Sequence, residues 1–124
     1  MDIIVDNHKS ISDIQKEFSE TYPFLKLEFF THRHGFQEGS LGKDLLKEET
    51  LQKRFQKAKY QGKVLVIQEE MKVADLEAQF QQVFDISAQV FRKSGRSWIE
   101  TTVTDDWTLK HQNDEGRELS YMAG

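Results

Sequence analysis

The sequence predicts an α+β two-layer sandwich of ferredoxin-like βαββαβ topology, and two repeated patterns predict it. Residues 11–22 and 73–84 carry apolar side chains at spacings of three and four, so each forms an amphipathic helix whose apolar face must be buried. Strand-like runs flank both helices, at residues 2–6, 24–32, 63–68 and 86–91. Because such crossovers are right-handed, the two units interleave into one antiparallel sheet with both helices on one face. An extra strand and a short helix follow.

The first strand–helix–strand unit opens the chain. An apolar run at 2–6 forms its first strand, and Ser10 is placed to cap the helix at 11–22, with Asp13 in the first turn where the helix dipole favours an anion. The run at 24–32 then alternates between two faces, as half-buried strands do. To the core we assign Leu25, Leu27 and Phe29. The other face carries Lys26, Glu28, Phe30, His32 and His34.

A long connection, residues 35–62, joins the second and third strands and far exceeds the length of a hairpin loop. Insertions of this size are typically functional, mobile, or both, so we expect a second contact surface here. Apolar spacing after Thr50 indicates a short helix with a basic face. A solvated face is the default interpretation, and an acidic partner or nucleic acid is the alternative. The basic residues are Lys53, Arg54, Lys57, Lys59 and Lys63.

The second unit ends in two strands, at 86–91 and 97–103, joined by a turn around Gly95. Glycine supplies the positive φ that a tight hairpin needs. The loop is either Ser94-Gly95 or Gly95-Arg96, and both give the same faces because side chains alternate with a period of two. Toward the helices we place Ile86, Ala88, Val90, Ile99, Thr101 and Val103. The opposite, open face then carries Ser87, Gln89, Phe91, Trp98, Glu100 and Thr102.

Three aromatic side chains, Phe30, Phe91 and Trp98, would therefore lie on the open face among polar groups. They can stack on bases, pack against a second subunit, or be covered by the C-terminal segment through Trp107 or Leu109. Burying one such side chain is worth about 2 kcal/mol, so a wet aromatic face is unfavourable. We favour burial by a subunit or the tail over nucleic acid, because acidic side chains share this face.

The open face predicts a non-enzymatic protein-interaction domain that forms a homo-oligomer, in the simplest case a dimer, with a further protein partner as an option. The alternative is a ligand-binding protein or enzyme of dimeric α+β barrel type, in which two open faces enclose a pocket. In both interpretations the candidate residues are Phe30, His32, Phe91, Trp98 and Glu100.

A metal site is a weaker interpretation. His32 and His34 lie two residues apart and can share a metal, but a stable zinc site needs four ligands, or three and a water molecule. No spacing in the chain selects the missing ligands. We therefore predict neither a metal nor another cofactor.

An adjacent acid pair, Asp105 and Asp106, suggests acid–base chemistry at first sight. We interpret it as the first turn of a helix capped by Thr104, where the helix dipole favours anions, and we predict no catalytic residue. Trp107 would anchor this helix to the body of the protein. The polar end of the chain, residues 113–124, is expected to fray.

The whole chain has 124 residues, which favours one domain over 1–124 with the insertion at 35–62 and a C-terminal cap and tail at 104–124. It has no cysteine, so disulfides, thiolate metal sites and a cysteine nucleophile are excluded. No signal peptide and no apolar run of about 20 residues occur, so we expect a cytoplasmic protein without membrane contact. The net charge of −4 argues against a general nucleic-acid binder.

One stretch resembles a group of other proteins. Residues 92–109, RKSGRSWIETTVTDDWTL, are similar to an SG…W…TT.TD.WTL pattern in a set of small, uncharacterised bacterial proteins. The resemblance covers roughly the last third of the chain. It implies no activity and no functional residue.

Overall fold

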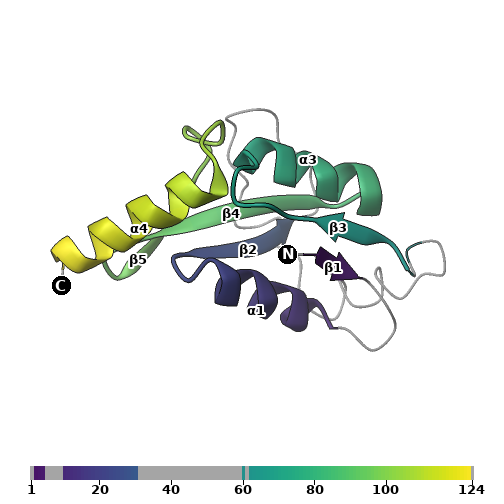
Figure 1. Cartoon of the computed structure of the whole chain (residues 1–124), viewed down its shortest axis with the longest axis horizontal. Coiled ribbons are helices and arrows are strands. Elements are labelled where there is room, and N and C mark those ends of the chain that lie inside the picture. The colour runs from purple at the N-terminus through teal and green to yellow at the C-terminus, as the bar shows by residue number, and fades with distance from the viewer. Residues whose placement is uncertain (1, 5–9, 31–59, 61, 124) are drawn as a thin grey trace.

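The computed structural model describes residues 2–4, 10–30, 60 and 62–123. Along the chain it contains β1 (Asp2–Ile4), α1 (Ile11–Thr21), β2 (Leu25–Phe30), β3 (Val64–Val66), α3 (Val73–Phe84), β4 (Ser87–Ser94), β5 (Ser97–Glu100) and α4 (Leu109–Ala123). Helices and antiparallel strands occur together, so the predicted α+β class is confirmed (Figure 1). The predicted insertion at 35–62 lies almost wholly outside the described residues.

The described strands form two antiparallel sheets rather than one. β4 lies between β2 and β5 in a three-stranded sheet, and β1 pairs with β3 in a separate two-stranded sheet. The predicted ferredoxin-like order, which needs the four strands of both units in a single sheet, is therefore not confirmed. The long connection between β2 and β3 does not force these two strands to pair.

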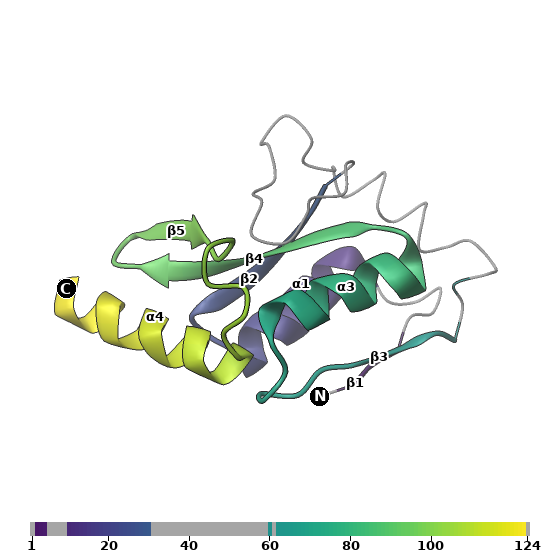
Figure 2. The same cartoon turned by 90° about the horizontal axis from the view of Figure 1, so that it is seen from above.

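Helices α1 and α3 lie between the two sheets (Figure 2). Gln79 of α3 holds β3 in place, because its side-chain nitrogen donates to the Val66 carbonyl at 3.0 Å and its Oε1 accepts from the Val66 N–H at 2.9 Å. Leu65 and Ile67 are fully buried in the same core as the helices. β3 is thus anchored to a helix, whereas the predicted fold would have paired it with β2.

The main core lies between α1, α3 and the three-stranded sheet, as the apolar spacing predicts. Its rings meet edge to face, with Phe29 of β2 5.3 Å from Phe80 of α3 between ring centroids. Such contacts add to the free energy gained by burying the rings. The fully buried members from these elements include Ile14, Phe18, Leu25, Leu27, Phe29, Leu76, Phe80, Phe84, Ala88 and Val90. The predicted core face of β2 is therefore confirmed.

The start of α1 also follows the prediction. The Ser10 hydroxyl accepts from the Asp13 N–H at 3.1 Å, and the Asp13 carboxylate accepts from the Ser10 N–H at 2.9 Å. In this reciprocal capping box each residue's side chain accepts from the other's backbone N–H, which fixes the start of the helix at Ile11.

The N-terminus of α3 is capped by another part of the chain. Its N-cap residue, Lys72, makes no side-chain capping hydrogen bond. Instead, the Val73 N–H donates to the Trp107 carbonyl at 3.0 Å and the Ala74 N–H donates to the Asp105 carbonyl at 2.7 Å. The turn before α4 therefore supplies the acceptors that the first turn of α3 requires.

The N-terminus of α4 is capped in the same way by the segment before α3. The Leu109 N–H donates to the Met71 carbonyl and the Lys110 N–H to the Glu69 carbonyl, both at 2.9 Å. Between the two pairs of bonds, Lys72 and Thr108 form an antiparallel bridge. The two helices thus cap each other through their preceding backbone, a contact we name the reciprocal cap.

The predicted helix start at Thr104 is wrong. Residues 104–107 form a turn closed by the Trp107 N–H on the Thr104 carbonyl at 2.9 Å, and the helix begins at Leu109. Thr108 is its capping residue, since its hydroxyl accepts from the His111 N–H at 3.1 Å. A helix begun at Asp105 would use the carbonyls of this turn within itself, whereas here those of Asp105 and Trp107 cap α3.

The predicted short helix with a frayed end is also wrong, because α4 continues to Ala123 and packs on the sheet. Asn113 Oδ1 accepts from the Phe24 N–H at 2.9 Å, and Gln112 Oε1 accepts from the Arg92 guanidinium at 2.8 Å. A Cβ placed on Gly116 would stand 2.9 Å from the Cβ of Phe24. The polar side chains of this helix therefore bond the body of the protein, and its glycine permits close approach.

We predict that Gly116→Ala lowers the free energy of unfolding. In an open helix this change stabilises by about 1 kcal/mol, because glycine is the poorer helix former. Here the new methyl group collides with Phe24 and with Arg92 Cγ, which would be 3.1 Å away. Urea denaturation measures the change, and the exposed Glu118→Ala in the same helix is the control, expected within about 0.5 kcal/mol of the parent. A more stable Gly116→Ala protein would show that α4 packs loosely.

Candidate functional site

The hairpin of β4 and β5 fixes which side chains share the open face. Ser94 pairs with Ser97, so the loop is Gly95-Arg96, the second of the two predicted loops. Gly95 has φ +62°, and Arg96 does not have positive φ, as in a type II′ hairpin turn. The local sequence therefore sets the register by placing glycine at the one position that needs it.

Side chains directly opposite each other on neighbouring strands lie on one face. Phe91 lies opposite Lys26 of β2 and opposite Glu100 of β5, and Trp98 lies opposite Lys93. The register thus places Phe91, Trp98 and Glu100 on the same face. We name Lys26, Phe91, Trp98 and Glu100 the open-face patch.

Lys26 sits above both aromatic rings of the open-face patch. Its Nζ is 5.4 Å from the centroid of Phe91 and 5.1 Å from that of Trp98, and 3.8 Å from a carboxylate oxygen of Glu28. Cation–π contacts at exposed sites are worth about 0.5–1 kcal/mol. Trp98 nevertheless remains 37% exposed and Phe91 is half-buried, so apolar ring surface remains in contact with solvent.

The other end of this face is buried. Phe30 is 3% exposed, and its opposite neighbour Ser87 and the nearby Gln89 are buried as well. Gln89 bonds the Val90 carbonyl through its side-chain nitrogen at 3.0 Å. Phe30, predicted to share an exposed surface with Phe91 and Trp98, is therefore a buried residue.

The C-terminal segment does not cover the open-face patch, so that predicted explanation is wrong. Leu109 is fully buried in the core, and Trp107 stacks on His111 with ring centroids 4.0 Å apart. The Arg92 guanidinium lies 5.5 Å from the Trp107 ring and projects from the helix-covered side of β4. Helices α1, α3 and α4 all lie on that side of the three-stranded sheet (Figure 2).

Two residues predicted to face the helices are exposed instead. Ile99 is 38% and Val103 is 76% exposed. β5 ends at Glu100, so Val103 belongs to no strand, and Ile99 lies on the outermost strand of the three-stranded sheet. Thr101 is buried, as predicted.

Several sequence candidates lie outside the described residues: His32, His34, Lys53, Arg54, Lys57 and Lys59. Lys63 is described and exposed. Within the described part of the chain, no group of three or more His, Asp or Glu side chains could hold a metal ion. Asp105 is buried and Asp106 is exposed, so the two adjacent carboxylates have different environments.

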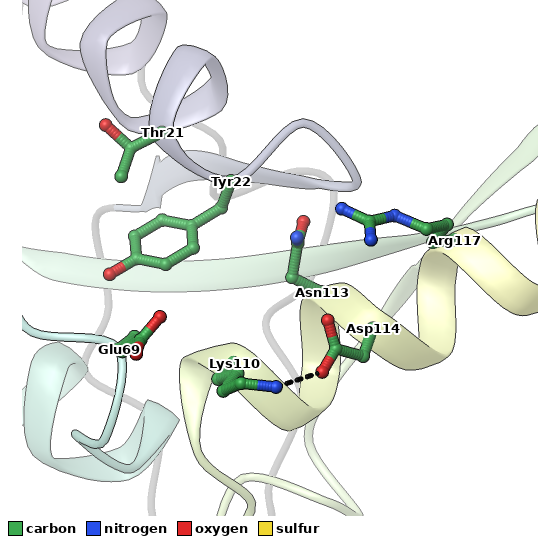
Figure 3. Close-up of a pocket in the computed structure, with 7 residues that line it drawn as sticks. All are labelled: Thr21, Tyr22, Glu69, Lys110, Asn113, Asp114 and Arg117. Atoms are coloured by element: carbon green, nitrogen blue, oxygen red, sulfur yellow. Dashed lines mark hydrogen bonds and ion pairs between the residues drawn. The ribbon is translucent and has the colours of Figure 1, made fainter.

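A hollow of about 410 Å³ lies between the end of α1 and the first turns of α4 (Figure 3). The sequence interpretation missed it, because its residues come from three separate segments. Four of its residues stand at helical spacings of three and four along α4. Had α4 been predicted at its full length, this spacing would have placed all four side chains on one face of the helix. The lining residues are Thr21, Tyr22, Glu69, Lys110, Asn113, Asp114 and Arg117.

The charges of this hollow largely compensate one another. Lys110 donates to Asp114 at 2.6 Å, which raises the pKa of Lys110 and lowers that of Asp114. Asn113 is engaged with backbone, and the Arg117 guanidinium lies 5.7 Å from the Phe24 ring centroid. The hollow therefore offers few unpaired groups to a ligand.

Tyr22 is the one lining residue whose pKa shift bears on chemistry. Burial raises the pKa of its phenol, and the carboxylates of Glu69 and Glu70 raise it further. The phenol is therefore protonated at neutral pH and is not suited to act as a general base.

No protein-family model, no curated protein and no solved structure matches this chain. In the part of the chain that the structure describes, no helix combines the length and apolar character needed to cross a bilayer. The functional argument therefore rests on the chain's own surfaces.

We predict that Tyr22→Phe reduces the loss of stability in alkali. Because the folded pKa of Tyr22 lies above its ordinary value of 10.0, the stabilisation is complete below pH 10 and is lost as pH rises through the folded pKa. Phenylalanine cannot ionise, so the variant should show a shallower fall in unfolding free energy above pH 10. Urea titrations across this range measure the slope, with the exposed Tyr121→Phe as the control. Equal slopes for Tyr22→Phe and the parent protein would contradict the assignment.

Proposed function

We propose that this protein is a small, non-enzymatic interaction domain that binds another protein surface, in the simplest case a second copy of itself, through the open-face patch. The observation that carries the proposal is the exposure of Trp98 and Phe91 on the sheet face opposite α1, α3 and α4. Large aromatic side chains are the commonest anchors of protein interfaces. Completing the burial of two such rings is worth on the order of 2 kcal/mol each at most.

The charges around the patch favour a protein partner over nucleic acid. Lys26 and Lys93 share the face with Glu28 and Glu100, so cations and anions alternate across it. A phosphate backbone is bound by surfaces that are mainly basic, whereas a protein partner can match both signs. The chain's net charge of −4 supports the same choice.

We predict that Trp98→Ala shifts the protein from an oligomer toward the monomer. Removing the most exposed ring of the patch should weaken self-association about tenfold or more, as expected for an anchor residue. Sedimentation velocity at concentrations around tens of micromolar measures the shift. Val103→Ala, which removes exposed apolar surface elsewhere, is the matched control and should leave assembly unchanged.

Two outcomes would count against the proposal. A parent protein that sediments as a strict monomer across this range removes self-association. If Trp98→Ala lowers only the melting temperature and leaves assembly intact, Trp98 is ordinary packing surface and the patch is not the contact.

A further inference from the structure

The free edge of β5 has a defined hydrogen-bonding polarity. Ser94 and Ser97 close a two-residue hairpin loop, and in such hairpins the closing pair exchanges both backbone hydrogen bonds. The bonded pairs then recur at every second residue. The Thr101 N–H accordingly donates to the Val90 carbonyl at 3.3 Å, at the position that this alternation predicts.

The backbone of alternate residues in β5 therefore points in opposite directions. Ile99 turns its N–H and carbonyl toward β4, whereas Trp98 and Glu100 turn theirs away from the sheet. β5 is the outer strand of the three-stranded sheet, and its residues 97–99 are exposed. Among the described residues no backbone partner meets the outward groups of Trp98 and Glu100. An edge of this kind is a template for another strand.

We propose that the strand added to this edge is β5 of a second copy of the chain, antiparallel to the first and related to it by a twofold axis at Trp98. This inference rests on the proposed function above and names the partner and the docking mode. The pairing of the two β5 strands joins two three-stranded sheets into one sheet of six strands. The two open-face patches then lie next to each other on either side of the twofold axis. The two Trp98 side chains then lie opposite each other on the same face.

Symmetry leaves few registers for such a pairing. A twofold axis perpendicular to the sheet keeps every residue on its own face, so opposing residues must have numbers of the same parity. With the axis at Trp98 or Ile99, the outward groups of Trp98 and Glu100 can bond the second copy, whereas an axis at Glu100 would set Trp98 opposite Thr102, which lies beyond β5.

Charge complementarity selects the register centred on Trp98. It places the exposed Arg96, the loop residue directly before β5, opposite Glu100 of the second copy, and the symmetry creates this pair twice. Neither side chain forms an ion pair with another described residue, so both are available. Centring on Ile99 would instead set Glu100 opposite Trp98 and Arg96 opposite Thr102. Opposite charges facing each other across strands stabilise pairing, and like charges oppose it.

A charge exchange tests the register. Arg96→Glu and Glu100→Arg each place like charges opposite one another at two positions, so each should weaken the dimer about tenfold or more in sedimentation velocity. The double variant restores both pairs in reversed order and should recover the parent dimer. Arg117→Glu and Glu118→Arg make the same changes in net charge on the exposed side of α4 and are the controls.

Glu100→Pro tests the edge itself. Proline removes the outward N–H of Glu100, which the β4–β5 hairpin does not use, so the monomer should fold with unchanged circular dichroism while the dimer is lost. A dimer that survives both Glu100→Pro and the single charge variants, yet dissociates in Trp98→Ala, overturns the edge pairing and leaves the proposed function standing. A parent protein that is monomeric at every concentration overturns the edge pairing together with the self-association on which it rests.

Discussion

The reciprocal cap between α3 and α4 is the constraint on which the rest of the fold depends. Four backbone N–H groups at two helix starts would lack partners within their own helices, and each buried N–H without a partner costs about 1–3 kcal/mol. Each helix is instead completed by the segment that precedes the other, around the bridge of Lys72 and Thr108. The backbone that precedes each helix therefore stabilises the start of the other.

The reciprocal cap also places both helices along the same strand. From α3, the Glu77 carboxylate accepts from the Val90 N–H at 3.0 Å, and from α4, Gln112 accepts from Arg92 at 2.8 Å. One face of β4 is thus covered by α3 near Val90 and by α4 near Arg92. None of the described helices lies over the opposite face, which carries Phe91, and this difference between the two faces makes the open-face patch a candidate binding surface.

The same contacts limit the length of β5. The Val90 N–H is taken by Glu77, and the Val90 carbonyl accepts from both the N–H and the hydroxyl of Thr101, at 3.3 and 2.9 Å. Ladder pairing cannot continue past this point, so β5 ends at Glu100 and presents a short edge. Short edges are the usual protection against uncontrolled strand addition, which suits a contact that closes on itself in a pair.

Much of this structure could be predicted from local sequence patterns. The helix at 73–84, the cap at Ser10 and the hairpin at Gly95 each depend on residues close in sequence, and all are observed. The start of α4 could not be predicted, because Thr104 followed by two aspartates has the local form of a helix cap, and only the distant α3 makes the turn at 104–107 preferable. Separation of the strands into two sheets likewise depends on Gln79 holding β3, a long-range contact.

The candidate site, too, has one part that local sequence predicts and another part that it does not. The shared face of Phe91, Trp98 and Glu100 follows from the period of two and the hairpin, whereas the burial of Phe30 and the hollow beside Tyr22 depend on segments that meet only in three dimensions.

Residue-resolved amide hydrogen exchange, recorded at several protein concentrations, tests the central claim most directly. The account predicts that the amides of Val73 and Leu109 in the reciprocal cap exchange slowly at every concentration. It predicts that those of Trp98 and Glu100 exchange rapidly in dilute solution and become protected as the concentration rises. Rapid exchange in the reciprocal cap, or exchange at Trp98 and Glu100 that does not change with concentration, would contradict it.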